Sequence, residues 1–428
     1  MKILITGTTG ESLPPPYAGI PKLSLLVAGI WKKQGHKIGL TFTYHHDKED
    51  DLEAGAEYFF EYNSKPDKLK KIFFLMRWFF ANPFLYKKLL RNYLKADPHI
   101  FSEAILYPAY GVFMDRIFSI FKPDIVLSEA ALIKTFMVAQ IARRRKVPVV
   151  FDTYAEIHDL SMGANKRLSE KERKNYWESF LGLADFIITP GPYCSRGPLT
   201  YLPKEKVEFV YDGSDYKLLN LDISGGRQSL RDSLKLPRDS FLIGMVGAFE
   251  ARKGHDHLIR AIAKLSKLGY PIEAVICGGS GDSTSWRNLA KEEGVEDKIH
   301  FFGRLSELEL AKVYKSLDVF SDLENSPRAC GLTMSILEGM AMSLPVVIYN
   351  NKEMLEIVHE GENGFIVPIN DIDALSNAIL KMYQLSPEKR REMGARSSVY
   401  ARKIDIDFTA HGKMELFKKI INNFNKKI

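Results

Sequence analysis

The sequence predicts an α/β protein made of two doubly wound domains, each with a parallel sheet covered by helices. Short apolar runs alternate with longer helical patterns along the whole chain, which is typical of parallel sheets. The chain has 428 residues, more than one ordinary hydrophobic core accommodates, so two or three domains are expected. Turn-forming residues concentrate at 213–225, and the domain boundary is expected there.

The expected strands are short apolar runs bounded by turn-forming residues. In the first half of the chain they are Lys2–Thr6, Lys37–Phe42, Ile125–Ser128, Val147–Asp152 and Phe186–Thr189. In the second half they are Phe241–Val246, Ile272–Cys277, Lys298–Phe302, Val319–Ser321, Pro345–Ile348 and Gly364–Val367.

The composition is that of a soluble globular protein, with 45% apolar residues, 26% charged residues and a formal net charge of +7. The three cysteines are far apart and lack metal-ligand spacing, which indicates a reducing compartment and argues against a disulfide framework. The apolar run at the start of the chain is too short for a signal peptide, and no apolar run of about 18 residues could form a transmembrane helix. We therefore expect a cytoplasmic protein, either soluble or attached to the inner face of a membrane.

The most informative segment is 330–347, Cys-Gly-Leu-Thr-Met-Ser-Ile-Leu-Glu-Gly-Met-Ala-Met-Ser-Leu-Pro-Val-Val. A short loop leads into a helix that carries Glu338, and Pro345 then introduces an apolar strand. The free N–H groups at the start of such a helix suit the phosphates of a nucleotide. Glu338, about two turns into the helix, could accept hydrogen bonds from a ribose diol. The alternative is an ordinary amphipathic helix before a strand.

This segment resembles the signature helix of the family 4 glycosyltransferases, E-G-F-G-x-x-x-x-E-A-M-A-x-G-x-P-V-V. Glu338 matches the second glutamate, whereas Cys330 stands where the first is expected. The resemblance implies a GT-B fold, with two Rossmann-like domains facing across a cleft. It implies an acceptor-binding domain at 1–215, a donor-binding domain at 216–404, and a C-terminal helix, about 405–428, that packs back on the first domain.

A second segment, 243–254, resembles the family motif V-G-R-L-x-x-x-K-G. Lys253 matches the lysine of the motif, and its ammonium would screen the charge that develops on the leaving diphosphate. Ala248 replaces the usual arginine, and Arg252 could substitute for it. The alternative is a solvated corner at the start of a helix.

Further motifs complete the expected donor side. The turn after Cys277 resembles the G-x-G turn at the nucleotide edge, and Phe302-Gly303-Arg304 resembles the segment beside the base, although Arg304 could equally be a surface charge. Gly19, at the start of a helix, would let the backbone approach the diphosphate unless it belongs to a plain strand–loop–helix connection. The expected donor-binding residues are Gly19, Gly247, Lys253, Gly278, Gly303, Arg304, Cys330, Gly331, Leu332, Thr333 and Glu338.

The first glycine loop, Gly7-Thr-Thr-Gly10, resembles the start of a short-chain dehydrogenase. A nicotinamide fingerprint needs a third glycine and a helix directly after the loop. Leu13 occupies the place of that glycine, and the three prolines that follow cannot lie inside a helix. A nicotinamide cofactor is therefore disfavoured. The family resemblance implies that neither a cofactor nor a metal is needed, because helix N-termini and cationic side chains neutralise the diphosphate.

On the first domain, the segment after Asp152 ends a strand that would face the cleft. Tyr154, Glu156 and His158, together with Asp152, are candidates for the acceptor side. Glu156 is the candidate base toward an acceptor hydroxyl. A single histidine near a strand end is more often structural, so the alternative is that His158 serves only the fold.

Cys330 cannot accept hydrogen bonds as a carboxylate does. Either the sugar is held by Glu324, Asn325 or Arg328, or the preferred sugar differs, or transfer activity has been lost. A reactive cysteine is the remaining alternative, since a helix N-terminus favours a thiolate, but the sequence identifies no partner histidine.

The segment 68–95 is basic and aromatic and reads as two helices split near Pro83. It is either a hairpin that packs against its domain or a peripheral attachment to an anionic membrane near a lipid-linked acceptor. Nucleic acid is a poorer match, because the charges accompany a large apolar surface and no recognisable module.

The family resemblance implies a retaining, metal-independent glycosyltransferase of the hexosyltransferase type. It would transfer a sugar from a nucleotide-diphosphate donor to a glycan or lipid-linked acceptor, in the synthesis of a cell-surface polysaccharide or glycolipid. Arg252, Lys253, Tyr154, Glu156 and His158 are the expected catalytic residues. The alternative is a catalytically weakened nucleotide-sugar or glycan binding protein of the same fold.

Overall fold

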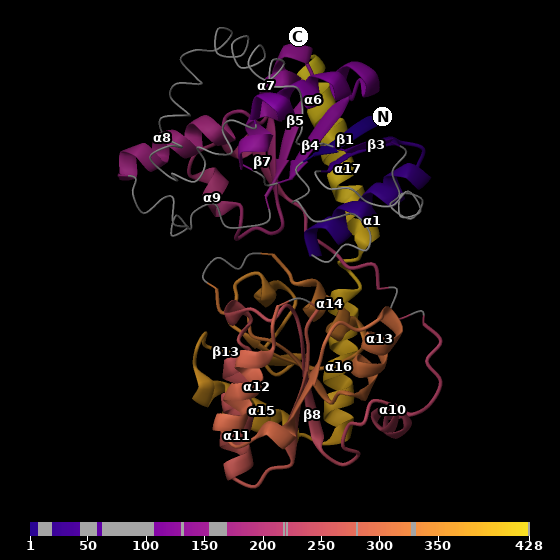
Figure 1. The fold of residues 1–428 in the computed structure, drawn as a ribbon, viewed down its shortest axis with the longest axis vertical. Coiled ribbons are helices and arrows are strands. Elements are labelled where there is room, and N and C mark those ends of the chain that lie inside the picture. The colour runs from indigo at the N-terminus through magenta and orange to yellow at the C-terminus, as the bar shows by residue number, and fades with distance from the viewer. Residues whose placement is uncertain are drawn as a thin grey trace. The chain divides into compact units, whose positions relative to one another are not determined.

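The computed structural model describes residues 1–6, 19–42, 58–61, 107–129, 132–153, 169–216, 219, 221–279, 281–326 and 331–426. These residues form two compact units, each with its own parallel sheet and covering helices (Figure 1). Unit 1 comprises Met1–Tyr211 and Thr409–Ile428, and unit 2 comprises Asp212–Phe408. The chain thus passes from unit 1 to unit 2 and returns to unit 1 at its C-terminal end.

The sheet of unit 1 has seven strands in the order β3-β2-β1-β4-β5-β6-β7, and every neighbouring pair is parallel. The central strand β1 is apolar and enclosed, with Ile3, Leu4 and Ile5 no more than 1% exposed. Strands that are buried on both faces read as continuous apolar runs, as here. The strands are β1 (Lys2–Thr6), β2 (Lys37–Phe42), β3 (Tyr58–Glu61), β4 (Ile125–Glu129), β5 (Val149–Asp152), β6 (Phe186–Thr189) and β7 (Val207–Phe209).

Helices cover the sheet of unit 1. α6 packs against α7, and their apolar faces join one core cluster with residues of β4 and β5. The helices are α1 (Gly19–Lys33), α6 (Tyr107–Phe121), α7 (Leu132–Arg145), α8 (Glu170–Leu181), α9 (Arg196–Leu199), the short 3-10 helix η2 (Lys204–Lys206) and α17 (Ile406–Asn425).

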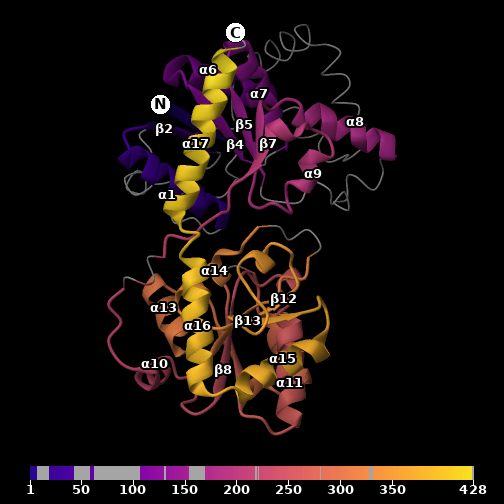
Figure 2. The same ribbon diagram turned by 180° about the vertical axis from the view of Figure 1, so that it is seen from behind.

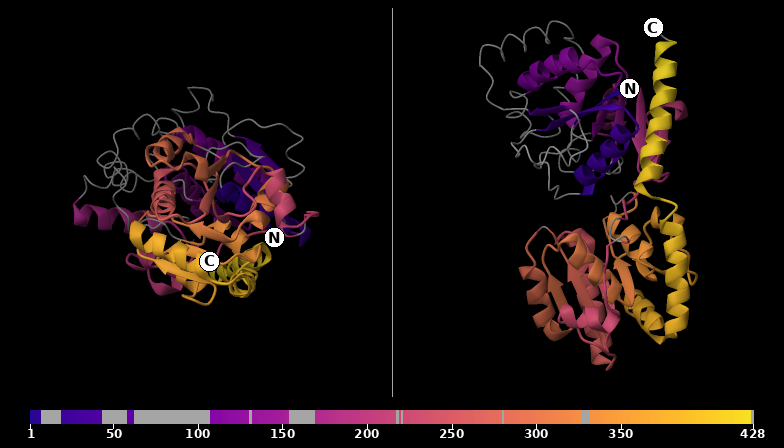
Figure 3. Two further views of the ribbon diagram at one scale, coloured as in Figure 1. Left: turned by 90° about the horizontal axis from the view of Figure 1, so that it is seen from below. Right: turned by 90° about the vertical axis from the view of Figure 1, so that its right-hand side faces the viewer.

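The C-terminal helix α17 runs along unit 1 (Figures 2 and 3). The ring of Phe417 lies 5.3 Å from the ring of Trp31, and the indole N–H of Trp31 donates to the carbonyl of Ala410 at 2.8 Å. The ammonium of Lys413 lies 2.7 Å from the carboxylate of Asp152, and both side chains are at most 3% exposed. These contacts attach α17 to α1 and to the end of β5.

The sheet of unit 2 has six strands in the order β10-β9-β8-β11-β12-β13, again with every neighbouring pair parallel. One cluster of its core includes Ile243, Ile262 and Val347. The strands are β8 (Phe241–Val246), β9 (Ile272–Cys277), β10 (Ile299–Phe302), β11 (Val319–Asp322), β12 (Val346–Tyr349) and β13 (Gly364–Val367).

The helices of unit 2 form two groups. α11 packs against α12 and α15, while α14 packs against α16 and α10 against α13. The α-helices are α10 (Arg227–Ser233), α11 (His255–Lys267), α12 (Thr284–Glu292), α13 (Glu307–Ser316), α14 (Met334–Ala341), α15 (Ile372–Gln384) and α16 (Pro387–Ala401). The 3-10 helices are η4 (Ala251–Lys253), η5 (Glu296–Lys298) and η6 (Met354–Glu356).

The prediction of two doubly wound α/β units is confirmed, and each expected strand is present with its ends shifted by two residues at most. The structure adds two edge strands, β3 and β7, that the apolar pattern did not indicate. β7 has only three residues, two of them exposed, so it lacks the apolar run by which the other strands were identified.

Two expectations from composition can be compared with the structure. No helix in the described part of the chain is both long and apolar enough to cross a membrane. Cys277 is free, and burial raises the pKa of its thiol to about 12. Cys194, in unit 1, is also buried.

Candidate functional site

The strands of unit 2 all end at one edge of the sheet, because all pairs are parallel. β8 has β9 on one side and β11 on the other, so the winding direction reverses between β8 and β11. In open α/β sheets, ligands bind outside the carboxyl ends of the strands at such a reversal. The segments that follow β8 and β11 are therefore the first candidates for a binding site.

A cluster of three charged side chains bridges these two segments. Lys253 and Arg252 belong to η4, after β8, and Glu324 follows β11. One carboxylate oxygen of Glu324 lies 2.8 Å from the ammonium of Lys253 and 2.6 Å from the guanidinium of Arg252. Arg252 also pairs with the exposed Glu250 at 2.6 Å. The structure thus brings together both cations that the sequence assigned to the diphosphate.

The burial of the three groups differs. Glu324 is 3% exposed, Lys253 18% and Arg252 47%. The second carboxylate oxygen of Glu324 is buried and has no hydrogen-bond partner among the described residues. A buried charge is stable only when it is paired, so Glu324 orients the two cations while they are not bound to a ligand. Their arrangement suits an anion with several oxygens, which could bind Lys253 and Arg252 together.

The helix that carries Glu338 begins beside this cluster. Thr333 caps α14, since its hydroxyl oxygen accepts from the N–H of Ile336 at 3.3 Å. The same hydroxyl donates to the carboxylate of Asp322, and Asp322 also accepts from the N–H of Glu324 at 3.2 Å. Asp322 therefore connects the start of α14 to the Glu324 segment. Leu332 is buried just before the cap.

Glu338 is held in place by a buried tyrosine. The hydroxyl of Tyr314, on α13, lies 3.1 Å from a carboxylate oxygen of Glu338. Tyr314 is fully buried and Glu338 is 8% exposed. Burial and then the charge of Glu338 raise the pKa of Tyr314 well above its usual range. Tyr314 therefore stays protonated and can act as a hydrogen-bond donor that fixes the carboxylate.

Two glycines near the cluster are required by geometry. Gly254 has φ +76°, and a Cβ there would lie 2.5 Å from the carbonyl oxygen of Leu323. The predicted donor residue Gly278 has a different explanation: a Cβ on it would lie 2.3 Å from the ring of Phe249. Gly278 thus makes room for an aromatic side chain, which is sufficient reason for the glycine. The predicted residue Gly247 is in ordinary contact with the side chain of Lys253.

The expected base-side residues lie at the β9–β10 side of the sheet. The guanidinium of Arg304 donates to the carbonyl of Gly279 at 3.3 Å, and a Cβ on Gly303 would meet no atom within 4 Å. The ring of Phe249 contacts two other rings on this side, since it lies 6.4 Å from that of Phe301 and 5.5 Å from that of His255. Burial lowers the pKa of His255 to about 4, so this ring is neutral near pH 7.

Several predicted residues lie outside the described part of the chain. They are Tyr154, Glu156, His158, Arg328 and Cys330, and the basic aromatic segment 68–95. Gly19 is described as the first residue of α1 in unit 1, and Gly331 follows Cys330 with φ +84°.

In unit 1, polar side chains also gather where strands end. The hydroxyl of Ser24 donates to the carboxylate of Glu129, at the end of β4, and both are buried. Asp152, proposed from the sequence as an acceptor-side group, forms the buried ion pair with Lys413. Among the described residues, no group of three or more His, Cys, Asp or Glu side chains is arranged to hold a metal ion.

Asp322 and Tyr314 contact the candidate site residues and were not predicted from the sequence. Asp322 is the last residue of β11, so a polar residue at the carboxyl end of an inner strand was an available signal. Tyr314 gave no such signal, because in the sequence pattern it occupies an ordinary apolar position on the buried face of α13.

Part of the chain matches a known family. Residues 226–399 match the family model of the glycosyl transferases, group 1. The chain is 28% identical over 168 residues to the putative glycosyltransferase EpsD of Bacillus subtilis, covering 39% of this chain and 42% of that protein. It is 26% identical over 224 residues to the D-inositol 3-phosphate glycosyltransferase of Corynebacterium urealyticum, covering 51% and 52%. The chain thus spans about half the length of these curated relatives.

Solved structures resemble the whole chain in fold. A glycosyltransferase from Rickettsia africae has a TM-score of 0.74 at 16% identity and covers 99% of both chains. Anabaena HepE, solved in complex with UDP and glucose, has a TM-score of 0.71 at 16% identity, covering 98% of this chain and all of HepE. At this identity the likeness concerns the fold. Residues 226–399 therefore match the group 1 glycosyl transferases, and the chain has the GT-B fold of two Rossmann-like domains.

Proposed function

We propose that the protein is a retaining glycosyltransferase that binds a nucleoside-diphosphate sugar in unit 2. The observation that carries this proposal is the pairing of Lys253 and Arg252 with Glu324 at the strand reversal between β8 and β11. Two cations and the nearby start of α14 suit a diphosphate. The family match over 226–399, which includes all of these residues, supports the same reading.

In the proposed reaction, the bond between the anomeric carbon and the diphosphate oxygen breaks while an acceptor hydroxyl attacks the same carbon from the face that the diphosphate leaves, so the configuration is retained. Lys253 and Arg252 stabilise the negative charge that develops on the departing diphosphate. Glu338, oriented by Tyr314, would accept hydrogen bonds from the ribose hydroxyls. Glu156 remains the proposed base for the acceptor proton. Because these cations would neutralise the diphosphate, we propose that transfer needs no metal.

The acceptor is proposed to be a glycan or a lipid-linked sugar, and the product a cell-surface polysaccharide or glycolipid. Segment 68–95 remains the sequence-based proposal for a membrane contact near such an acceptor. The relative EpsD is named as a putative glycosyltransferase, and HepE was crystallised with UDP-glucose, so UDP-sugars are the first donors to test.

The test is calorimetric titration of the protein with UDP, GDP and ADP, followed by the corresponding nucleotide sugars. We expect one nucleoside diphosphate to bind and Glu338→Ala to weaken that binding. Glu388→Ala, which removes an exposed carboxylate at the start of α16, serves as the control and should bind like the wild type. If none of the three nucleotides binds to the folded protein, the donor site is refuted.

A catalytically weakened binding protein is the second candidate, because Cys330 and Ala248 depart from the family motifs. Incubation with the donor that binds distinguishes the two functions. Release of nucleoside diphosphate, in water or with added acceptors, supports the transferase. Tight donor binding without any release favours the binding protein.

A further inference from the structure

The two carboxylate oxygens of Glu324 have very different surroundings. One oxygen, Oε2, lies 2.8 Å from the ammonium of Lys253 and 2.6 Å from the guanidinium of Arg252. The other, Oε1, is buried and has no hydrogen-bond partner among the described residues. A buried acceptor without a partner is costly. The carboxylate is therefore held in this place by the attraction of the two cations and against the cost of its second oxygen.

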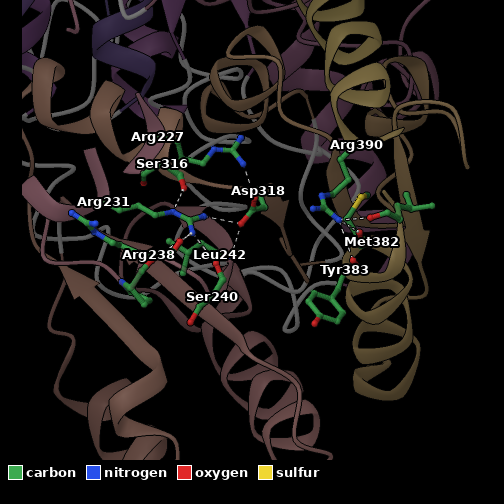
Figure 4. Close-up of polar contacts among 12 residues, drawn as sticks. Arg227, Arg231, Arg238, Ser240, Leu242, Ser316, Asp318, Met382, Tyr383 and Arg390 are labelled. Carbon is green, nitrogen blue, oxygen red and sulfur yellow. Dashed lines mark hydrogen bonds and ion pairs between the residues drawn. The ribbon is translucent and has the colours of Figure 1, made fainter. Parts of the chain in front are cut away.

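Another carboxylate of unit 2 also pairs with two cations, and it shows the contrast. The Oδ1 atom of Asp318 accepts from Arg227 at 2.6 Å (Figure 4). Its Oδ2 atom accepts from Arg231 at 2.8 Å and from the N–H of Leu242 at 2.9 Å. Both oxygens of Asp318 thus have partners, as expected of an ion cluster that serves the fold. Glu324 does not reach this state in its own cluster.

The cations beside Glu324 can bind a further anion. The ammonium of Lys253 has three N–H donors, its ion-pair partner among the described residues is Glu324, and its side chain is 18% exposed. Arg252 uses one nitrogen for Glu324 and another for Glu250, and it is 47% exposed. A phosphate that arrives from solvent can therefore reach both cations. It then has to compete with a carboxylate that already neutralises part of their charge.

The backbone around Glu324 is fixed by contacts that do not involve its carboxylate. The preceding residue, Leu323, is fully buried in the core of unit 2. The N–H of Glu324 donates to the carboxylate of Asp322 at 3.2 Å. The N–H of Asn325 donates to the carbonyl of Arg252 at 2.8 Å and joins this segment to η4. The carboxylate can therefore turn away from the cations while the segment stays in place.

We propose that Glu324 competes with the nucleoside diphosphate for Lys253 and Arg252 and thereby promotes its release after transfer. This inference rests on the proposed function of the site. Cleavage leaves the nucleoside diphosphate with more negative charge than the nucleotide sugar had, so the two cations attract the product more strongly than the donor. A carboxylate that pairs with the cations again as the diphosphate leaves counteracts this attraction.

The test is calorimetric titration of Glu324→Gln with UDP, GDP or ADP, whichever binds the wild type. Glutamine keeps the length of the side chain and removes its negative charge. The affinity for the nucleoside diphosphate should rise by roughly 10-fold or more, because a competing charged hydrogen-bond partner is removed. Dissociation, followed by stopped-flow mixing, should slow by a similar factor. Inorganic phosphate, which lacks the base and the ribose, should also bind the variant more tightly than the wild type.

Glu250→Gln is the matched control. It removes the other carboxylate that pairs with Arg252, but Glu250 is 49% exposed. Exposed pairs contribute little, so the affinity for the nucleoside diphosphate should change by less than about twofold. Glu324→Asp is a second probe, which keeps the charge on a shorter side chain and should raise the affinity less than Glu324→Gln does. Denaturant titrations show that each variant is folded, and the aspartate variant carries the test if the glutamine variant does not fold.

The sign of the effect decides between two roles of Glu324. If the carboxylate only orients the cations, its removal should weaken binding, so equal or weaker binding by the folded variants would overturn the proposal. A loss of affinity for the nucleotide sugar alone would also overturn it and would assign Glu324 to the sugar. If no nucleoside diphosphate binds the wild type, the proposed function fails and this inference falls with it. Binding by the wild type with no gain in the variants refutes this inference alone.

Discussion

Lys253 is the residue on which the proposed donor site most depends, and Lys253→Gln removes its charge while keeping a hydrogen-bond donor on a side chain that is one bond shorter. The ammonium is 2.8 Å from Glu324 and 18% exposed, so a phosphate that bound it would be largely shielded from water. A hydrogen bond to a charged group in such a setting contributes about 1.5–3 kcal/mol. We therefore expect the affinity for the nucleoside diphosphate to fall by roughly 10-fold to 150-fold.

The fold should tolerate this change. Removing one partner of a buried ion pair usually costs about 3–5 kcal/mol, because a buried charge is left alone. Here Glu324 keeps Arg252 at 2.6 Å, and glutamine can still donate to it. The free energy of unfolding, measured with denaturant, should therefore fall by no more than about 2 kcal/mol.

The assay is calorimetric titration with the nucleoside diphosphate that binds and with the monophosphate of the same base. Only the diphosphate has the second phosphate, so the variant should lose affinity for the diphosphate and keep its affinity for the monophosphate. Lys264→Gln, on α11, breaks the exposed pair with Asp373 of α15 and controls for the loss of one charge. An equal loss for both nucleotides, or no loss for either, would refute the assigned role of Lys253.

Two further predictions concern buried groups of unit 2. Tyr314→Phe removes the hydrogen bond to Glu338. The affinity for the ribonucleotide should fall by about 3-fold to 10-fold, while the affinity for the 2′-deoxynucleotide should stay the same. Calorimetry with both nucleotides checks this, and an equal loss of affinity for both would contradict it. Burial lowers the pKa of His255 from its ordinary 6.5 to about 4. Between pH 4 and pH 6.5 this histidine therefore binds more protons in the unfolded state than in the folded state. The free energy of unfolding should therefore fall by up to about 3 kcal/mol as the pH decreases from 6.5 to 4. Denaturant titrations across this range should show a smaller decrease for His255→Phe, and identical pH profiles for the two proteins would disprove the role of this ring.

The sequence by itself determined the fold class and predicted several candidate site residues. Apolar runs such as Phe241–Val246 and Ile272–Cys277 matched strands β8 and β9 residue for residue, because an enclosed parallel strand needs a continuous apolar run. Lys253 and Glu338 were predicted as candidate site residues because each lies in a local motif at the start of a helix or within it. These signals are local, since they depend on neighbours within a few residues along the chain.

Only the tertiary structure decided how these residues meet. Glu324 pairs with Lys253 because β11 lies next to β8, and this strand order is not encoded in the apolar pattern of either strand. Tyr314 reads as a core residue until the packing of α13 places its hydroxyl against Glu338. Gly278 matches a nucleotide-binding turn in sequence, yet the ring of Phe249 fills the space that its missing Cβ leaves. Such contacts join segments far apart in the chain, so their partners are set by the arrangement of the elements and cannot be read from either segment alone.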